Sequence, residues 1–303
     1  MNLMNKGLIN VTAYSLWVDD HDALTGTILF GGIDKSKFEG ELVNIDIVPI
    51  VRHIRSMYYI DIATIAVHVD GKRSEVLSRN PIFRFRAVLD PTTSWSFLPI
   101  ALGSRLARKI GGTVYKKALG MFIIDCERGQ SHDFVEFEFA GVKIPVLLKQ
   151  LVSKVGESED GKPVCALAFT AMQPRPGEQV IHSFEYSIGD SVLRSAYVVY
   201  DMQNKVVSIA KRASNGKVAR IYALNSSGVP AGLIGQPETP LPTIHNMSTP
   251  NYGSTTLAVY RRAVVIVVVL ILGFYLWSIY NRRRRRAKST LTTDRQASFP
   301  KSH

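Results

Sequence analysis

Paired cysteines, paired histidines and glycine-rich loops are nearly absent from this 303-residue sequence. Its only cysteines, Cys126 and Cys165, do not form a Cys-x-x-Cys motif, and no two of the seven histidines stand at the spacing of metal ligands. No glycine-rich loop follows a predicted strand in the pattern that binds phosphate. The sequence therefore contains no metal or nucleotide motif, and we expect no metal and no other cofactor.

Acidic residues are scarce towards the C-terminus, which explains the formal net charge of +12. From Asn281 to His303, eight Lys or Arg and one Asp give a net charge of +7, and Arg261 and Arg262 add +2. Only +3 is left for the first 260 residues. A nucleic-acid partner therefore has little support, because a nucleic-acid-binding domain carries its basic residues on the domain itself.

One uncharged apolar run is long enough to cross a membrane. The 18 residues from Ala263 to Tyr280 carry no charge, and as a helix they span about 27 Å, close to a hydrocarbon core of roughly 30 Å. Five consecutive arginines, Arg282 to Arg286, follow the run. The positive-inside rule predicts a single-pass protein of the secretory pathway or plasma membrane, with a cytoplasmic tail and residues 1–260 outside or in a lumen.

Cysteines and glycosylation signals agree with a luminal domain. An even number of cysteines suits one disulfide, which forms in oxidising compartments. Three sequons precede the apolar run, at Asn10, Asn225 and Asn246. The N-terminus, however, lacks the long apolar segment of a signal peptide. We therefore expect the chain to be part of a longer protein.

The first 212 residues predict a mostly β domain. Short β-rich runs flank polar turns, which is typical of β-hairpins. One helix is predicted from Pro99, because apolar residues recur at 102, 106 and 110 before a Gly-Gly stop. The predicted hairpins span residues 13–32, 57–77, 132–146 and 195–211, with turns at Asp70-Gly71, Gly141 and Gln203–Lys205 in the last three.

The strand pattern fades from about Ala213. Prolines and many Gly, Ser and Thr residues there are typical of a linker rather than a core. The sequence thus predicts four regions: a β domain (1–212), a stalk (213–262), a transmembrane helix (263–280) and a basic tail (281–303).

The order of several motifs resembles the C-terminal lobe of the pepsin-like aspartic endopeptidases. A strand pair ends in Gly31-Gly32-Ile33-Asp34, and "DPTTSWSFLP" (90–99) stands where that lobe carries its catalytic Asp-Ser/Thr-Gly-Thr and a Leu-Pro. "FEFAGVKIPV" and "SIGDSVLRSAYVVYDMQNKVVSIA" resemble its Phe-x-Phe-x-Gly strand and its closing motif. The stalk and anchor resemble those of surface-anchored fungal members. The resemblance covers residues 7–212 and implies an all-β fold, one lobe of a bilobal acid protease.

The resemblance implies that Asp90 is the catalytic Asp of this lobe, supported by Thr93 and Ser94. The motif is altered, because Pro91 replaces a Ser or Thr and Thr92 replaces a Gly. Pro91 has no hydroxyl and no N–H, and Thr92 brings a stiff β-branched side chain to a tight turn. The backbone N–H of Thr92 can still donate to the carboxylate if its conformation allows. Together the two changes suggest a relaxed catalytic geometry.

The same resemblance assigns three other features. Cys126 and Cys165 stand where the lobe has its disulfide. Ile188-Gly189 stands where the family supports its catalytic loop. The acidic cluster Asp19 to Asp22, the remaining candidate for a metal site, falls in a hairpin turn.

Two functions from different classes follow. The first is peptide-bond hydrolysis at acidic pH by a membrane-anchored aspartic endopeptidase. Because the family uses two aspartates, one from each lobe, we expect this chain alone to be inactive. Its partners would be a peptide or protein substrate, the membrane, and either the missing N-terminal lobe or a second copy through the exposed lobe interface. The alternative is a non-catalytic relative, a cell-surface binding or scaffold module.

Overall fold

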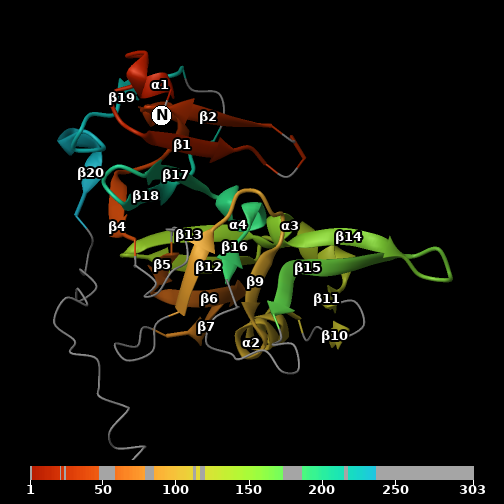
Figure 1. The fold of residues 1–303 in the computed structure, drawn as a ribbon. Helices are drawn as coiled ribbons and strands as arrows, with labels where there is room; N and C mark the ends of the chain where they lie inside the picture. The colour runs from red at the N-terminus through yellow and green to blue at the C-terminus, as the bar shows by residue number, and fades with distance from the viewer. Residues whose placement is uncertain are drawn as a thin grey trace, which may run out of the picture. The chain divides into compact units, whose positions relative to one another are not determined.

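The computed structural model describes residues 2–20, 22–23, 25–47, 59–78, 85–111, 114–116, 120–172, 186–214 and 218–236. The chain divides into two compact units, residues 1–242 and 243–303, and all described residues lie in the first. Strands predominate there, as the sequence predicted (Figure 1). The expected membrane helix (263–280), tail (281–303) and third sequon (Asn246) lie outside the described residues. Within those residues, no helix has the length and apolar character needed to span a membrane.

A sheet of six described strands carries an apolar core on each face. Along its second strand, Leu16 packs into the larger core and the next residue, Trp17, packs into the smaller one, as expected for alternating side chains. Two predicted hairpins, β1–β2 and β17–β18, supply four of the strands. The strand order is β2 (Gly26–Phe30), β1 (Ala13–Val18), β17 (Ala196–Asp201), β18 (Val206–Lys211), β4 (Leu42–Asp46) and β20 (Ile234–Gly235).

The larger core continues into a second sheet, in which strands distant in sequence are neighbours. Strand β16 lies between β8 and β9, although β8 and β9 are consecutive in the chain. The order of the described strands is β10 (Val114–Lys116), β11 (Met121–Ile124), β15 (Pro163–Met172), β9 (Ser96–Pro99), β16 (Ser187–Ile188), β8 (Phe85–Leu89) and β5 (Tyr59–Ile62), with β14 (Val152–Glu157) also paired to β15.

A third sheet contains the other two predicted hairpins. Both turn residues of β6–β7 have positive φ, 51° at Asp70 and 72° at Gly71, and so do Ala140 (49°) and Gly141 (93°) in β12–β13. Such pairs form the tight turns whose twist matches that of the strands. The order is β13 (Val142–Leu147), β12 (Phe134–Phe139), β6 (Thr64–Val69) and β7 (Lys72–Leu77).

The predicted helix and disulfide are both present. Helix α2 buries Leu102, Leu106 and Ile110, the three positions of its apolar stripe. Cys126 and Cys165 form a disulfide with a Cα–Cα distance of 5.2 Å. The described helical elements are α1 (Asn2–Asn5), α2 (Ile100–Gly111), α3 (Leu148–Leu151), α4 (Asp190–Leu193) and the 3₁₀ turns η1 (Lys35–Lys37), η2 (Cys126–Gln130) and η3 (Ala231–Leu233).

The folded lobe continues past residue 212, where the sequence analysis began the stalk. Strand β19 (Ile221–Ala223) pairs with β3 (Gly32–Asp34), β20 pairs with β4, and Leu224 is fully buried. The N–H of Arg220 donates to the Asp34 carboxylate at 2.9 Å. Burial acts to raise the pKa of Asp34, but this bond and those from Ser36 hold it below its usual value. Short strands of two or three residues have no readable period, so the sequence analysis placed residues 218–236, whose strands pair with the lobe, in the stalk.

Candidate active site

Asp90 lies where β8 ends, in a loop that is held from both sides. Its backbone N–H donates to the Ile188 carbonyl at 2.9 Å, and the N–H of Asp190 donates to the Thr93 carbonyl at 2.8 Å. Strand β16 runs parallel to β8 and antiparallel to β9, so the chain on either side of the loop pairs with the same short strand. Because β16 lies between β8 and β9, it holds both ends of the loop formed by residues 90–95.

Gly189 packs directly under the loop. A Cβ atom at this position would lie 2.6 Å from the Trp95 carbonyl oxygen and 2.7 Å from that of Thr93. Its N–H donates to the Ser96 hydroxyl at 2.9 Å, and Ser96 is fully buried. Only glycine fits such a close backbone approach. The predicted support from Ile188-Gly189 is thus present, whereas the role of Ser96 was not foreseen.

The Asp90 carboxylate takes most of its hydrogen bonds from Thr92. The N–H of Thr92 donates to Oδ1 at 2.9 Å and its hydroxyl donates to the same atom at 2.6 Å. Thr92 is exposed and does not have positive φ, so its side chain fits the turn without backbone strain. Thr92 thus supplies two donors of its own to the carboxylate, and the relaxed catalytic geometry expected from the Pro91-Thr92 pair stays a prediction.

The two hydroxyls predicted to support Asp90 differ from each other. The Thr93 hydroxyl oxygen is 3.5 Å from Oδ2 of Asp90 and 3.2 Å from the Trp95 carbonyl oxygen, so the carbonyl is the nearer of its two acceptors. Ser94 is exposed and makes no hydrogen bond to the residues that the structure describes. Thr93 thus lies within reach of the Asp90 carboxylate, whereas Ser94 is exposed and makes no hydrogen bond to it. Their catalytic roles stay predictions.

Tyr200 supports the strand that enters the site, and the sequence analysis did not single it out. Its hydroxyl donates to the Leu89 carbonyl at 3.1 Å. Burial raises the pKa of Tyr200 well above its usual value, so the hydroxyl stays protonated. Because Asp90 N–H is bonded to Ile188, both polar atoms of the Leu89–Asp90 peptide are held. The signal was the second Tyr of "YVVYD" in the closing motif.

The other acidic groups near this region are engaged elsewhere. The Asp190 carboxylate is 2.8 Å from Arg194, whose guanidinium also donates to the Asp19 carbonyl. In the acidic cluster, the Asp22 carboxylate lies 2.7 Å from the Lys149 ammonium group, and the Asp19 carboxylate lies 3.4 Å from the Arg212 guanidinium. The cluster connects β1 and β2, as predicted. Among the described residues, no group of three or more metal-ligating side chains converges.

Comparison with known proteins gives a consistent family. Residues 1–212 match the model of the family described as eukaryotic aspartyl protease. The chain is similar to aspartic proteinase 3 of Saccharomyces cerevisiae, with 31% identity over 232 residues, covering 74% of this chain and 37% of the relative. It is also similar to aspartic proteinase yapsin-3 of the same yeast, with 31% identity, covering 84% of this chain and 46% of the relative. A probable aspartic-type endopeptidase, OPSB, of Arthroderma otae is 28% identical, with coverages of 78% and 50%. The chain therefore spans half or less of the length of these relatives.

Proposed function

The chain belongs to the eukaryotic aspartyl protease family, and we propose that it supplies one of the two carboxylates of an aspartic endopeptidase site. Asp90 is that carboxylate. The observation that carries the proposal is the pair of bonds that hold the loop at both ends, from Asp90 to Ile188 and from Asp190 to Thr93. A catalytic group must be held by its surroundings, and this loop meets that requirement.

A single carboxylate does not complete the reaction. In the two-aspartate mechanism, one group activates a water for attack on the peptide carbonyl and the other donates a proton. The two titrate as a pair, because like charges so close do not both ionise. In the described part of the chain, the loop contacts Asp190 through its backbone, and the Asp190 carboxylate is paired with Arg194. We therefore propose that the second aspartate comes from a first lobe, so that the chain alone would not hydrolyse peptides.

Residues 237–303 would attach this lobe to a membrane. The uncharged run 263–280 and the arginines 282–286 support a single span with a cytoplasmic tail. In the lobe, Asn10 and Asn225 are both exposed, which suits glycosylation in a lumen. Replacing each by Gln removes its glycan, so the chain from secretory membranes would move faster in a gel. No shift for either variant would contradict the luminal orientation.

Hydrolysis of a peptide at acidic pH tests the activity proposal. We expect the full chain alone, purified in neutral detergent, to cleave no faster than its Asp90→Asn variant. Asn keeps the size of the side chain but removes the titrating oxygen. Cleavage by the wild-type chain that the Asn variant lacks would overturn the need for a second aspartate.

Pro91 supports a second candidate function, that of a non-catalytic surface module. It removes the hydroxyl and N–H that a Ser or Thr would bring next to the carboxylate. The two candidates separate once a first lobe with its own aspartate is present. An inactive two-lobed protein that gains activity when Pro91 is changed to Ser and Thr92 to Gly would favour the non-catalytic module.

A further inference from the structure

One long stretch of the lobe contains positive charge and no negative charge. Residues 91–124 include no Asp and no Glu. Their cationic residues are Arg105, Arg108, Lys109, Lys116 and Lys117. The first 260 residues have a net charge of +3, so without these five cations they would have a net charge of −2. The positive excess of the lobe therefore comes from the stretch that contains helix α2 and strand β10.

Helix α2 presents three of these cations to solvent on one face. Its apolar stripe is buried, whereas Arg105, Arg108 and Lys109 are exposed. They are three or four positions apart, so their side chains are neighbours on the helix, and like charges at this spacing destabilise a helix. Arg108 donates to the Ser104 carbonyl at 3.3 Å, and none of the three cations forms an ion pair with a described residue. The helix thus carries neighbouring positive charges that no described carboxylate balances.

The end of α2 explains only part of this charge. Basic residues in a last turn favour the helix dipole, which accounts for Arg108 and Lys109 but not for Arg105, one turn earlier. One carboxylate does lie near this end, that of Asp133, but it is 3.1 Å from the Arg128 guanidinium, which donates to the Ile110 carbonyl at 2.7 Å. Asp133 is therefore already paired.

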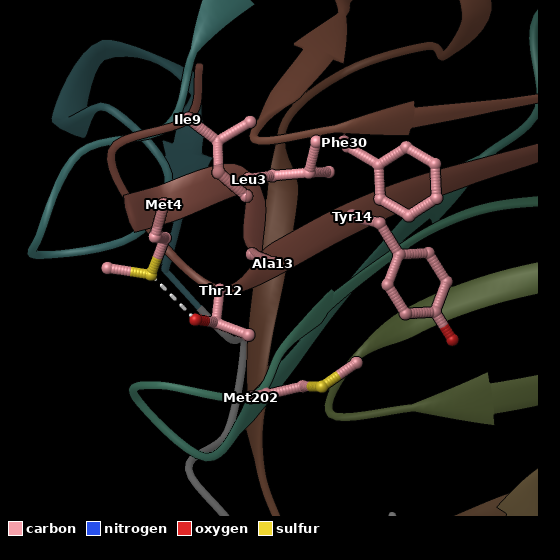
Figure 2. Close-up of a pocket in the computed structure, with 8 residues that line it drawn as sticks. All are labelled: Leu3, Met4, Ile9, Thr12, Ala13, Tyr14, Phe30 and Met202. Atoms are coloured by element: carbon pink, nitrogen blue, oxygen red, sulfur yellow. Dashed lines mark hydrogen bonds between the residues drawn. The ribbon is translucent and has the colours of Figure 1, made fainter. Parts of the chain in front are cut away.

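The exposed face of α2 is neither apolar nor aromatic. Apolar side chains gather in a different place, in a pocket of about 360 Å³ with Leu3, Tyr14 and Phe30 in its lining, to which α2 contributes no residue (Figure 2). Within α2, the single large apolar residue that is exposed is Ile100, at the first position. A helix that binds a bilayer inserts an apolar face, and single-stranded nucleic acid stacks on aromatic rings. The face of α2 therefore suits a partner that is recognised by charge alone.

We propose that Arg105, Arg108 and Lys109 bind an anionic polysaccharide, a chain that repeats sulfate or phosphate groups. Each guanidinium offers paired donors to two oxygens of one such group. Arg105 and Lys109 are roughly 6 Å apart along the helix axis, so a flexible polyanion can place successive groups against successive cations. The choice of a polysaccharide rests on the luminal orientation proposed above. Because α2 follows β9 at the end opposite the Asp90 loop, the bound chain would leave that loop free.

Amine acetylation of the full chain in neutral detergent tests this face. Dextran sulfate is the probe, uncharged dextran is the control polymer, and mass spectrometry measures the acetylation rate of each lysine. We expect dextran sulfate to slow acetylation of Lys109 on the order of tenfold at low salt and to lose this effect as salt screens the charges. Lys143 and Lys205, which are exposed outside the stretch, should react at unchanged rates. The readout is local, so binding of the polymer to Arg282–Arg286 does not obscure it.

Two double variants with equal loss of charge sharpen the test. Arg105→Gln with Arg108→Gln should abolish the slowing at Lys109, whereas Lys143→Gln with Lys205→Gln should preserve it. All four side chains are exposed, so both variants should keep the melting temperature of the wild-type chain.

Three results would overturn the proposal. The first is equal slowing at Lys109, Lys143 and Lys205, and the second is slowing at Lys109 that survives the arginine substitutions. The third is stronger slowing by phosphatidylserine vesicles or polyglutamate at the same charge concentration, which would identify a different partner. None of these readouts depends on Asp90 or on membrane orientation, so their failure would leave the proposed function untouched.

Discussion

The Asp90 loop and strand β2 both reach the surface, but the loop is held by partners within the lobe and one edge of β2 has none among the described strands. At the loop, the flanking strands pair with β16, Gly189 packs beneath, and the carboxylate accepts two bonds from Thr92. At β2, one edge has no partner among the described strands, and Ile28 and Phe30 are more than half exposed. The loop is complete as local structure although it holds one carboxylate. The edge of β2, in contrast, is not covered by any of the described strands.

Of the changes considered, breaking the disulfide should cause the largest loss in the free energy of unfolding. Replacing both Cys126 and Cys165 by Ser opens a loop with a sequence separation of 39, and on the chain-entropy model this lowers the free energy of unfolding by about 4 kcal/mol. Denaturant unfolding measures the loss. Cys165 lies in β15, which pairs with β9 at the end of the Asp90 loop, so hydrogen exchange should increase there and not in β2. An increase in hydrogen exchange in β2 rather than in β9 would contradict this prediction.

Adding one methyl group beneath the Asp90 loop should cause the next largest loss of stability. Gly189→Ala places a Cβ against two backbone carbonyls, and we expect a loss of about 3 kcal/mol in the free energy of unfolding. Gly156→Ala on β14 is the matched control, since its added Cβ would meet nothing within 4 Å. Equal losses for the two variants would show that the loop tolerates a shift in this backbone contact.

Removing the Tyr200 hydroxyl is a smaller change. Tyr200→Phe leaves the Leu89 carbonyl without its donor, and the expected cost is about 1 kcal/mol in thermal or denaturant unfolding. The control is Tyr14→Phe, in a ring stacked on Tyr200 at 4.9 Å whose hydroxyl makes no bond to the described residues. A Tyr200→Phe variant as stable as the control would remove Tyr200 from the support of Asp90.

Truncating β2 should have the smallest effect on stability. Ile28→Ala is expected to cost less than about 0.5 kcal/mol in dilute solution, because the side chain is mostly in water already. Leu16→Ala on the neighbouring strand, at the same register position, should cost about 2–5 kcal/mol. Similar values for the two would mean that β2 is buried in solution.

The hairpins could be predicted because their turn chemistry is local. Asp70-Gly71 and Gly141 predict turns, because the positive φ values of such turns are adopted by only a few residue types. The register of Asp90 came from a family resemblance, and so did Ile188-Gly189. Ser96 and Tyr200 were missed because their contacts join residues about 90 and 110 positions apart, which no sequence period encodes.

The end of the lobe could not be predicted for a related reason. Strands β19 and β20 have three and two residues and exist because β3 and β4 offer free partners. Their stability comes from pairing rather than from their own composition. Likewise, the sequence analysis did not foresee that the Thr92 hydroxyl donates to the Asp90 carboxylate.

The central claim is that Asp90 is one of two catalytic carboxylates, and cleavage by a two-lobed protein tests it most directly. The full chain would be joined to a first lobe carrying its own aspartate, and initial rates of peptide hydrolysis at acidic pH compared with those of the Asp90→Asn variant. We predict activity for the wild-type protein and a loss of at least about 10³-fold for the variant. Equal rates for the two would contradict the assignment of Asp90.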